Sequence, residues 1–395
     1  VVKALIKALG DRDAEVRMRA VVALGNTGNT IAIPYLIKVL EKDTDHLRAC
    51  AATAMGKFIE DSVLEPLIKA LEDYAPAVRK QSAISLGIIG YTEAIKPLEE
   101  ARNREGLLSI HMKDVMSDAI DRLTKGPTAA QYMEMADIFV KQSRFELAED
   151  CYKKSIELKQ NSYESYVNLG NIYCSQGKYK EALETYISSL KLKPYNYEIY
   201  NAIGNIYTTM GDYQKAIDAY KQVIDIEPDF ATAYNNLGFA YYNQGEFYNA
   251  ILEYRKSIAL DEKFPMAYNN LGNAYSALGN YELAIEEYRK ALKLQPDMSL
   301  AHNNLGFAYA KMNKHDMAIL SYMEAIKLTP GFAMAYINLA FSYATQGKYE
   351  SAIKYYRKAI ECDPNNYEAY TGLAQVYELC GHYDEAIEQY EEALQ

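Results

Sequence analysis

Asparagine side chains recur at a fixed spacing in the last two thirds of this 395-residue sequence. The clearest series, with a 34-residue period, is Asn236, Asn270, Asn304 and Asn338. An amide offers both a hydrogen-bond donor and an acceptor, so a row of amides could hold the main chain of an extended peptide whatever its sequence. The chemistry that these residue types predict is therefore binding, not catalysis.

The sequence has no motif of a catalytic or phosphate-binding site. It contains no G-x-S-x-G, no G-x-x-x-x-G-K-[ST], no H-E-x-x-H and no EF-hand loop. The five cysteines are far apart and form no C-x-x-C pair, which indicates free thiols in a reducing compartment. We therefore expect a non-enzymatic, cytoplasmic protein with no cofactor and no metal.

Charge and hydropathy exclude several classes of partner. The formal net charge is −11 and there is no long basic run, so nucleic acid is not an expected partner. No run approaches 18 consecutive apolar residues, so no membrane span is predicted. The segment 1–128 is neutral and holds only Tyr35, Tyr74 and Tyr91 of the many tyrosines, which indicates two different architectures in one chain.

From position 129 onward, eight repeats with a 34-residue period follow one another without an insertion. In each, apolar residues at positions 4, 7, 8 and 11 and at 17, 20, 21, 24 and 28 have helical spacing, which predicts two helices. Position 15 is Gly except for Ser143 and Asn313, and Gly or Asn tolerates the left-handed conformation that ends a helix. Position 8 is always Gly or Ala, which permits close approach of helix axes, and position 24 is always Tyr. Each repeat is thus predicted to be an antiparallel helix pair that packs against its neighbours.

This pattern resembles the tetratricopeptide repeat (TPR) family over residues 129–395. Its regular Asn-Asn-Leu-Gly form is most similar to the superhelical arm of O-linked N-acetylglucosamine transferases and to bacterial and archaeal proteins of that style. The resemblance implies a right-handed superhelix in which the first helix of each pair lines a concave groove.

The N-terminal part has a 31-residue period, seen in the pairs Val16-Arg17, Leu47-Arg48 and Val78-Arg79. It resembles short HEAT repeats of phycobilisome-lyase-like proteins over about four copies in residues 1–123, although no residue identifies a chromophore site. The fourth copy is degenerate, with Ser109-Ile110 in place of Val-Arg, and residues 124–128 form a short junction. The predicted fold is all-α, with two fused α-solenoids: a HEAT-like array followed by the TPR superhelix.

In the TPR family, positions 2, 5, 6, 9, 12 and 13 of each repeat face the groove, and the resemblance assigns candidate peptide-binding residues at them. The asparagines at positions 5, 6 and 9 are Asn168, Asn171, Asn201, Asn205, Asn235, Asn236, Asn269, Asn270, Asn273, Asn303, Asn304 and Asn338. The apolar side chains are Phe239, Phe307 and Phe341 at position 9 and Met266, Leu300 and Met334 at position 2. Two alternatives stay open: the amides could bond neighbouring helices instead, and the apolar side chains could be buried between repeats.

The groove positions of repeats three to seven carry two charges, Glu198 and Lys311, so we expect an extended, largely uncharged peptide as the ligand. The set of Lys and Arg with which some TPR proteins grip an acidic C-terminus is absent. The predicted function is a non-catalytic protein-interaction scaffold; the alternative is the substrate-recognition arm of a larger enzyme, such as a protein glycosyltransferase, whose catalytic domain lies outside this chain. The last repeat stops at position 29 without a polar capping helix, which suggests that more chain follows and also allows self-association through that repeat.

Overall fold

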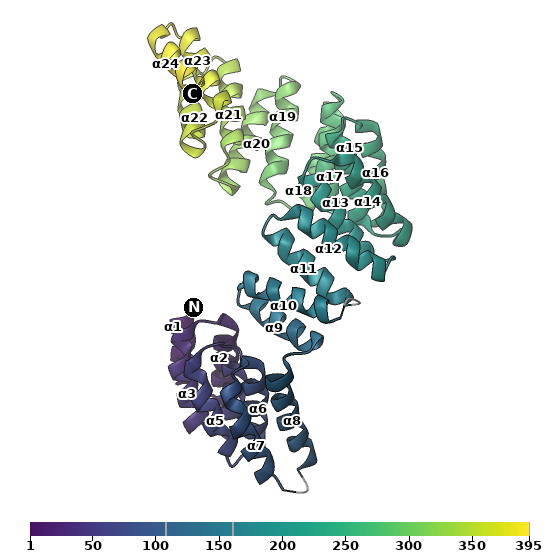
Figure 1. Cartoon of the computed structure of the whole chain (residues 1–395). Helices are drawn as coiled ribbons and strands as arrows, with labels where there is room; N and C mark the ends of the chain where they lie inside the picture. The colour runs from purple at the N-terminus through teal and green to yellow at the C-terminus, as the bar shows by residue number, and fades with distance from the viewer. Residues whose placement is uncertain (107–108, 160–161, 395) are drawn as a thin grey trace. The chain divides into compact units, whose positions relative to one another are not determined.

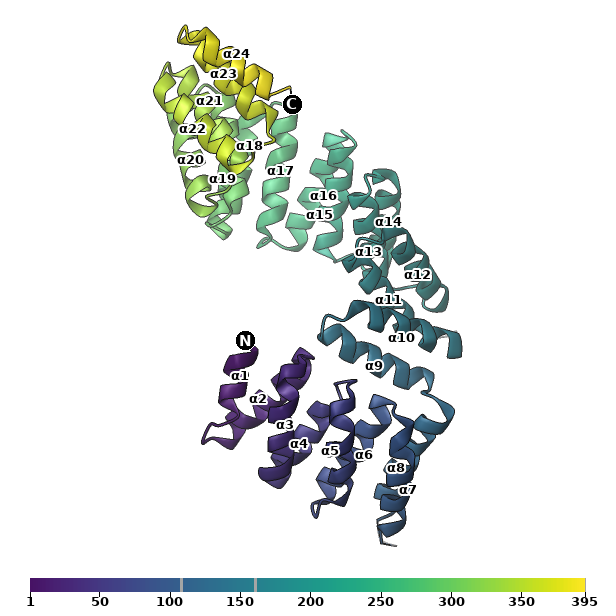
Figure 2. The same ribbon diagram turned by 60° about the vertical axis from the view of Figure 1, so that its left-hand side comes forward.

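The computed structural model describes residues 1–106, 109–159 and 162–394, and helices are the regular secondary structure found there. Contacts divide the chain into two compact units, Val1–Pro194 and Tyr195–Gln395. Figures 1 and 2 show that each unit is a row of paired helices. The predicted all-α solenoid is confirmed, whereas the predicted limits 1–123, 124–128 and 129–395 stay a prediction.

The first unit contains helices of both periods. Those of the 31-residue period are α1 (Val2–Ala8), α2 (Ala14–Thr27), α3 (Ile33–Lys42), α4 (Asp45–Met55), α5 (Leu64–Lys69), α6 (Pro76–Ile89), α7 (Ile95–Arg104) and α8 (Ile110–Lys125). Short 3-10 helices lie at Thr30–Ala32, Asp61–Val63, Ala70–Glu72 and Thr92–Ala94. Leu36, Leu67 and Leu98 are fully buried in one apolar core, because they occupy equivalent places in successive repeats.

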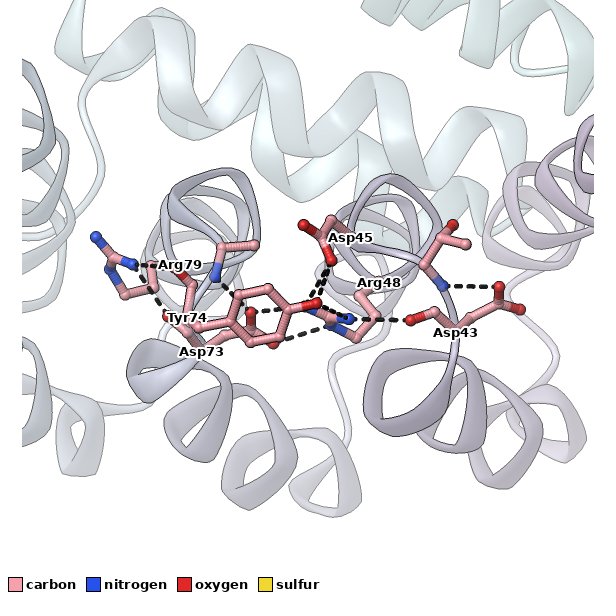
Figure 3. A network of polar contacts seen from close by, with 8 residues as sticks. Asp43, Asp45, Arg48, Asp73, Tyr74 and Arg79 are labelled. Carbon is pink, nitrogen blue, oxygen red and sulfur yellow. Dashed lines mark hydrogen bonds and ion pairs between the residues drawn. The ribbon is translucent and has the colours of Figure 1, made fainter.

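A ladder of arginines joins the HEAT-like repeats (Figure 3). Arg48 donates from Nε and Nη2 to the two carboxylate oxygens of Asp73 at 3.0 and 2.9 Å, and from Nη1 to the backbone oxygen of Asp43 at 2.9 Å. Its guanidinium carbon also lies 4.6 Å from the centre of the Tyr74 ring. One side chain thus ties the loop of its own repeat to the carboxylate of the next.

The same arrangement occurs at both neighbouring steps of the ladder. Arg17 binds the Asp43 carboxylate at 3.0 and 3.1 Å, and Arg79 binds Glu105 at 2.7 Å. The series ends there because Ser109-Ile110 stands where the next repeat would supply an arginine. The hydrophobic-Arg pairs that define the 31-residue period are therefore inter-repeat contacts.

Acid is expected to weaken this ladder. Burial alone would raise the pKa of Asp43, but hydrogen bonds from Arg17 and the Thr44 N–H lower it below its usual value. The hydrogen bond from Arg79 lowers the pKa of Glu105. Since the unfolded state then binds more protons than the folded state, the stabilisation is present above a pH of about 4 and is lost as the pH falls further.

The melting temperature of the first unit should therefore fall between pH 5 and pH 3, and it should fall less in an Arg79→Met variant than in the wild type. In that variant the pKa of Glu105 returns toward its ordinary value. Thermal unfolding of both proteins across this pH range measures the difference. Parallel curves for the two proteins would contradict the role given to Glu105.

The two repeat types meet between α8 and α9 (Ala129–Lys141). Gly126 has a φ of +81°, and α9 starts with a capping box between Thr128 and Gln131. The chain therefore leaves α8 and begins α9 within a few residues. At the other end of α9, Gln142 donates from Nε2 to the backbone oxygen of Lys57 at 2.8 Å. The first 34-residue repeat is thus held against the HEAT-like helices by a contact between distant parts of the sequence.

The 34-residue repeats form antiparallel helix pairs. In the first unit, α9 is followed by α10 (Phe145–Leu158), α11 (Tyr163–Ser175) and α12 (Tyr179–Leu192). The second unit contains α13 (Tyr197–Thr209), α14 (Tyr213–Ile226), α15 (Ala231–Asn243), α16 (Phe247–Leu260), α17 (Pro265–Ala277), α18 (Tyr281–Leu294), α19 (Ser299–Lys311), α20 (His315–Leu328), α21 (Ala333–Thr345), α22 (Tyr349–Cys362), α23 (Tyr367–Leu379) and α24 (Tyr383–Glu392).

The residue at position 15 turns the chain between the helices of each pair. All eight residues there adopt positive φ, including Ser143 at 59° and Asn313 at 60°. The prediction of a left-handed turn at this position is therefore confirmed, and it holds for the two residues other than glycine.

Position 8 of the first helix packs against the tyrosine at position 24 of the second. A Cβ added to Gly272 would lie 2.6 Å from Cε1 of Tyr288, and the equivalent contact at Gly204 and Tyr220 is 2.5 Å. The tyrosine rings are at most 2% exposed at both places. The ring of position 24 therefore fills the space that the missing side chain at position 8 leaves.

Candidate peptide-binding groove

The predicted asparagines of the second unit bond to one another across successive repeats. The asparagine at position 6 donates from Nδ2 to the Oδ1 of the asparagine at position 5 of the preceding repeat. The pairs are Asn236 with Asn201 at 3.2 Å, Asn270 with Asn235 at 3.0 Å, Asn304 with Asn269 at 3.2 Å and Asn338 with Asn303 at 3.0 Å. We call this series the asparagine ladder.

The asparagines at position 9 bind a tyrosine hydroxyl in addition. Tyr220 donates to Asn205 and Tyr288 to Asn273, both at 2.8 Å. Asn273 also accepts from Asn304 at 3.0 Å. Burial raises the pKa of Tyr220 to about 12 and also raises that of Tyr288, so both hydroxyls stay protonated donors near neutral pH. The amide oxygens at position 9 are therefore used inside the protein.

Burial separates the candidate asparagines into two groups. Asn235, Asn269, Asn270 and Asn303 are less than 10% exposed. The half-buried or exposed ones are Asn168, Asn171, Asn201, Asn205, Asn236, Asn273, Asn304 and Asn338. The first group bonds neighbouring helices, as one of the two interpretations of the sequence proposed. A direct contact with a peptide stays a prediction, and accessibility favours the second group for it.

The candidate apolar residues lie on the surface of the first helices. Phe239, Phe307 and Phe341 are 41%, 38% and 56% exposed, on α15, α19 and α21. Met266, Leu300 and Met334 are exposed too. The alternative that these side chains are buried between repeats is therefore wrong. They form a row of exposed apolar groups at equivalent positions of neighbouring repeats.

Each unit contains a cavity that candidate asparagines line. In the second unit, a cavity of about 430 Å³ is lined by Asn273, Asn304, Phe307 and Lys311, among others. In the first unit, a cavity of about 390 Å³ brings Asn168 and Asn171 together with Asp137, whose carboxylate accepts a hydrogen bond from Tyr152. Three of the predicted residues thus share one cavity, and two share the other.

Sequence reasoning missed the tyrosines at position 24 as partners of the asparagines at position 9. Their invariance in all eight repeats was the available signal, but it does not show which atom each hydroxyl reaches. His302 and His315 form no common site: His302 contacts the backbone oxygen of Pro296 at 2.9 Å, and His315 begins the next helix. Among the described residues, no group of three or more potential metal ligands comes together.

Family models match most of the chain. Models of the tetratricopeptide repeat match residues 132–162, 151–184, 170–211, 204–245, 241–279, 272–313, 299–332, 333–366 and 355–388. The chain belongs to the tetratricopeptide repeat family. A model of HEAT repeats matches residues 1–49 and 45–106, so HEAT repeats precede the TPR array. Both families predicted from the sequence are confirmed.

Solved TPR structures resemble parts of this TPR protein. MamA is 33% identical over 41% of this chain and 95% of its own, with a TM-score of 0.38. A tetratricopeptide repeat protein from Parabacteroides merdae is 20% identical over 68% of this chain and 99% of its own, with a TM-score of 0.53, and shows the shared fold. YrrB, described as a TPR protein with an unusual peptide-binding site, is 21% identical over 47% of this chain and 95% of its own, with a TM-score of 0.38. No curated protein sequence matches the chain.

The TPR fold is typically a non-catalytic interaction scaffold. A search for membrane spans, limited to the residues that the structure describes, finds no helix with the length and apolar character needed to cross a bilayer.

Proposed function

We propose that this TPR protein is a non-catalytic interaction scaffold that binds extended, largely uncharged peptide segments along the first helices of its repeats. The observation that carries the proposal is the cavity in which Asn273, Asn304 and Phe307 meet, beside a row of exposed Phe, Met and Leu side chains. Phenylalanine supplies a large contact area, and methionine adapts to side chains of different shape. Such a surface suits an apolar or uncharged ligand.

The ladder limits what its amides can offer a peptide. Nδ2 of Asn304 already donates to the Oδ1 atoms of two asparagines, one at position 5 and one at position 9, at 3.2 and 3.0 Å. Nδ2 of Asn236 does the same at 3.2 and 3.4 Å. Each carbonyl oxygen has two lone pairs, so the Oδ1 atoms keep capacity to accept. We therefore expect these amides to accept hydrogen bonds from peptide N–H groups, which gives main-chain recognition that does not depend on the peptide sequence.

A triple variant, Phe239→Ser, Phe307→Ser and Phe341→Ser, tests the proposal. We expect it to lower the affinity for captured peptides by at least about ten-fold, because it removes three aromatic contacts at a small cost in stability. The matched control changes exposed apolar residues of second helices, Leu252→Ser, Leu320→Ser and Met323→Ser, and should bind as the wild type does. The Phe→Ser changes alter exposed side chains only, whereas Asn→Ala changes would also break hydrogen bonds between repeats.

The measurement uses the full chain to select from a random library of peptides of about twelve residues, which span roughly 40 Å when extended. Enrichment by the wild type and the control, but not by the triple variant, is the expected result. Equal enrichment by all three proteins, or none by the wild type, would overturn the proposal. The substrate-recognition arm of a larger enzyme would use the same surface, so that alternative stays a prediction that this experiment does not decide.

A further inference from the structure

One second helix of the TPR array, α20, has an apolar outer surface. Met317, Leu320 and Met323 occupy positions 19, 22 and 25 of their repeat and are 43%, 64% and 46% exposed. Residues three apart lie on the same side of a helix. We call these three residues the apolar face of α20. Large apolar side chains that are exposed side by side on a soluble protein commonly mark an interface.

The other second helices of this unit carry polar side chains at the same positions. In the order 19, 22 and 25, α14 has Lys, Asp and Lys, α22 has Ser, Lys and Arg, and α24 has three Glu. Helices α16 and α18 have one Leu each among the three. All these repeats form the helix pair, so the fold does not require apolar residues there. The apolar face is therefore a property of one repeat and not of the TPR scaffold.

The methionine at position 25 takes the place of an inter-repeat hydrogen bond. In three other repeats, the arginine at this position donates from Nη2 to the tyrosine hydroxyl at position 11 of the next repeat. The pairs are Arg255 with Tyr275 at 2.5 Å, Arg289 with Tyr309 at 2.6 Å and Arg357 with Tyr377 at 2.6 Å. The thioether of Met323 has no proton to donate to Tyr343. Packing inside the chain thus does not explain Met323, whereas an apolar partner would.

The apolar face is the same in both directions along the helix. Leu320 is its centre, Met317 lies three residues before it and Met323 three residues after it. In a two-fold symmetric interface, a contact from one residue to another is repeated in reverse by the second copy. Two antiparallel copies of α20 would therefore pack leucine against leucine on the axis and Met317 against Met323 on either side of it. Methionine adapts readily to such a contact, because its side chain is unbranched and flexible.

We propose that the apolar face of α20 binds the same face of a second copy of this chain, in an antiparallel two-fold interface. The inference goes beyond peptide binding and does not depend on it, since the proposed peptide site lies along the first helices. The occupant is a second copy because the face is complementary to itself.

The charges beside the apolar face agree with this arrangement. A two-fold axis across α20 places α18 opposite α18 of the second copy, and α22 opposite α22. On α18, Glu282 and Lys290 lie four residues before and after position 22, so each comes to the level of the other in the second copy. Glu350 and Lys358 have the same relation on α22. Opposite charges that meet in this way favour the association.

One pair of like charges opposes the association and gives a test of opposite sign. Asp316 and Glu324 lie four residues before and after Leu320, so they also come to one level across the axis. Glu324 accepts from Lys327 at 2.8 Å, and Asp316 accepts from Nε2 of Gln346 at 2.8 Å. Asp316→Asn keeps an oxygen for Gln346 and removes the repulsion. It should therefore lower the dissociation constant of the dimer by about 2- to 5-fold.

Sedimentation equilibrium of the full chain tests the interface. Concentrations between about 1 and 300 μM are suitable, because small interfaces associate in the micromolar range or more weakly. We expect the wild type to form dimers. Leu320→Glu should raise the dissociation constant at least about 100-fold, because it brings two carboxylates together on the axis. The matched control, Leu252→Glu, changes an exposed leucine at the same position of α16 and should dimerise like the wild type.

Dimerisation and peptide binding should separate. The variant Leu252→Ser, Leu320→Ser and Met323→Ser is expected to be a monomer that still selects peptides. The variant Phe239→Ser, Phe307→Ser and Phe341→Ser is expected to be a dimer, because its substitutions lie on first helices.

Disulfide cross-linking tests the register in a Cys362→Ser background, since Cys362 is an exposed thiol. Leu320→Cys should form a covalent dimer on mild oxidation, because residues on the axis face their own copies. A mixture of Met317→Cys and Met323→Cys chains should cross-link at least about ten-fold faster than either chain alone.

Three results would overturn the proposal. The first is a wild type that stays monomeric at all concentrations, and the second is a Leu320→Glu variant that dimerises like the wild type. An Ile387→Glu variant tests the exposed surface of α24 in the same way. If it alone abolished the dimer, the interface would be at the last repeat instead. The third is cross-linking of Met317→Cys chains to one another faster than in the mixture, which would contradict the antiparallel arrangement.

Discussion

An Arg48→Met variant is expected to lose about 3 kcal/mol of stability in the HEAT repeats. Arg48 is 6% exposed, and its guanidinium holds both oxygens of Asp73, the backbone oxygen of Asp43 and the hydroxyl of Tyr74. Methionine fills a similar volume but donates nothing, so the half-buried Asp73 carboxylate is left without its cation. Removing one partner of a buried pair costs more than the pair contributes.

Hydrogen exchange of the full chain localises the effect, because opening in a repeat array spreads from the weakened interface. Amides of α4 and α6 should exchange about 100-fold faster in the variant, which corresponds to about 3 kcal/mol. The control is Arg104→Met, which breaks a pair with Glu72 whose two side chains are more than half exposed. We expect a change below about 1 kcal/mol there.

A second substitution distinguishes the buried charge from lost packing. Asp73 also accepts from the Ala75 N–H at 2.8 Å, a contact that asparagine can keep. The double variant Arg48→Met with Asp73→Asn removes the unpaired charge and should regain part of the stability. Two results would contradict the stabilising role given to the ladder of arginines. One is amide exchange in Arg48→Met as slow as in the wild type, and the other is a double variant that is less stable than the single one.

A Gly272→Val variant is expected to lower the free energy of unfolding of the second unit by about 3 kcal/mol. A Cβ at Gly272 would already lie 2.6 and 2.8 Å from ring atoms of Tyr288, which is 2% exposed and cannot move into solvent. Two further methyl groups force the ring out of its site and disturb its hydrogen bond to Asn273. Alanine should cost less, because Ala136, Ala340 and Ala374 stand at the same position in other repeats.

The partner substitution completes a double-mutant cycle. Tyr288→Ala should cost about 3–5 kcal/mol, because it leaves a cavity between two helices. Valine at Gly272 occupies part of that cavity, so the double variant should lose less than the sum of the two single changes. Urea denaturation of the full chain measures the four stabilities, with the exposed Ala259→Val as a control for valine in a helix. Additive losses would mean that the glycine and the tyrosine do not share one space.

The period of the sequence was sufficient to predict the helix pairs and their turns. Apolar positions with helical spacing are determined by burial against the same neighbours in each repeat, so they are repeated in the sequence itself. The left-handed turn at position 15 follows from local sterics, which is why Gly177 and Asn313 both indicate it. A small residue at position 8 and a Tyr at position 24 occur together in every repeat, which likewise indicates a contact within one repeat.

The partners of polar side chains were not available from the sequence. Asn304 can donate or accept in several directions, and whether it meets Asn269 or a ligand depends on the offset between neighbouring repeats. The reach of Arg48 to Asp73 depends on the same offset.

The sequence by itself thus determined the all-α repeat architecture, because periodic burial and local backbone conformation are encoded residue by residue. Only the tertiary structure decided that Asn235 and Asn303 are buried in a ladder, that Phe307 is exposed, and that Lys311 shares a cavity with Asn273. These properties depend on how closely consecutive helix pairs pack, and that distance is set by the side chains of two repeats together.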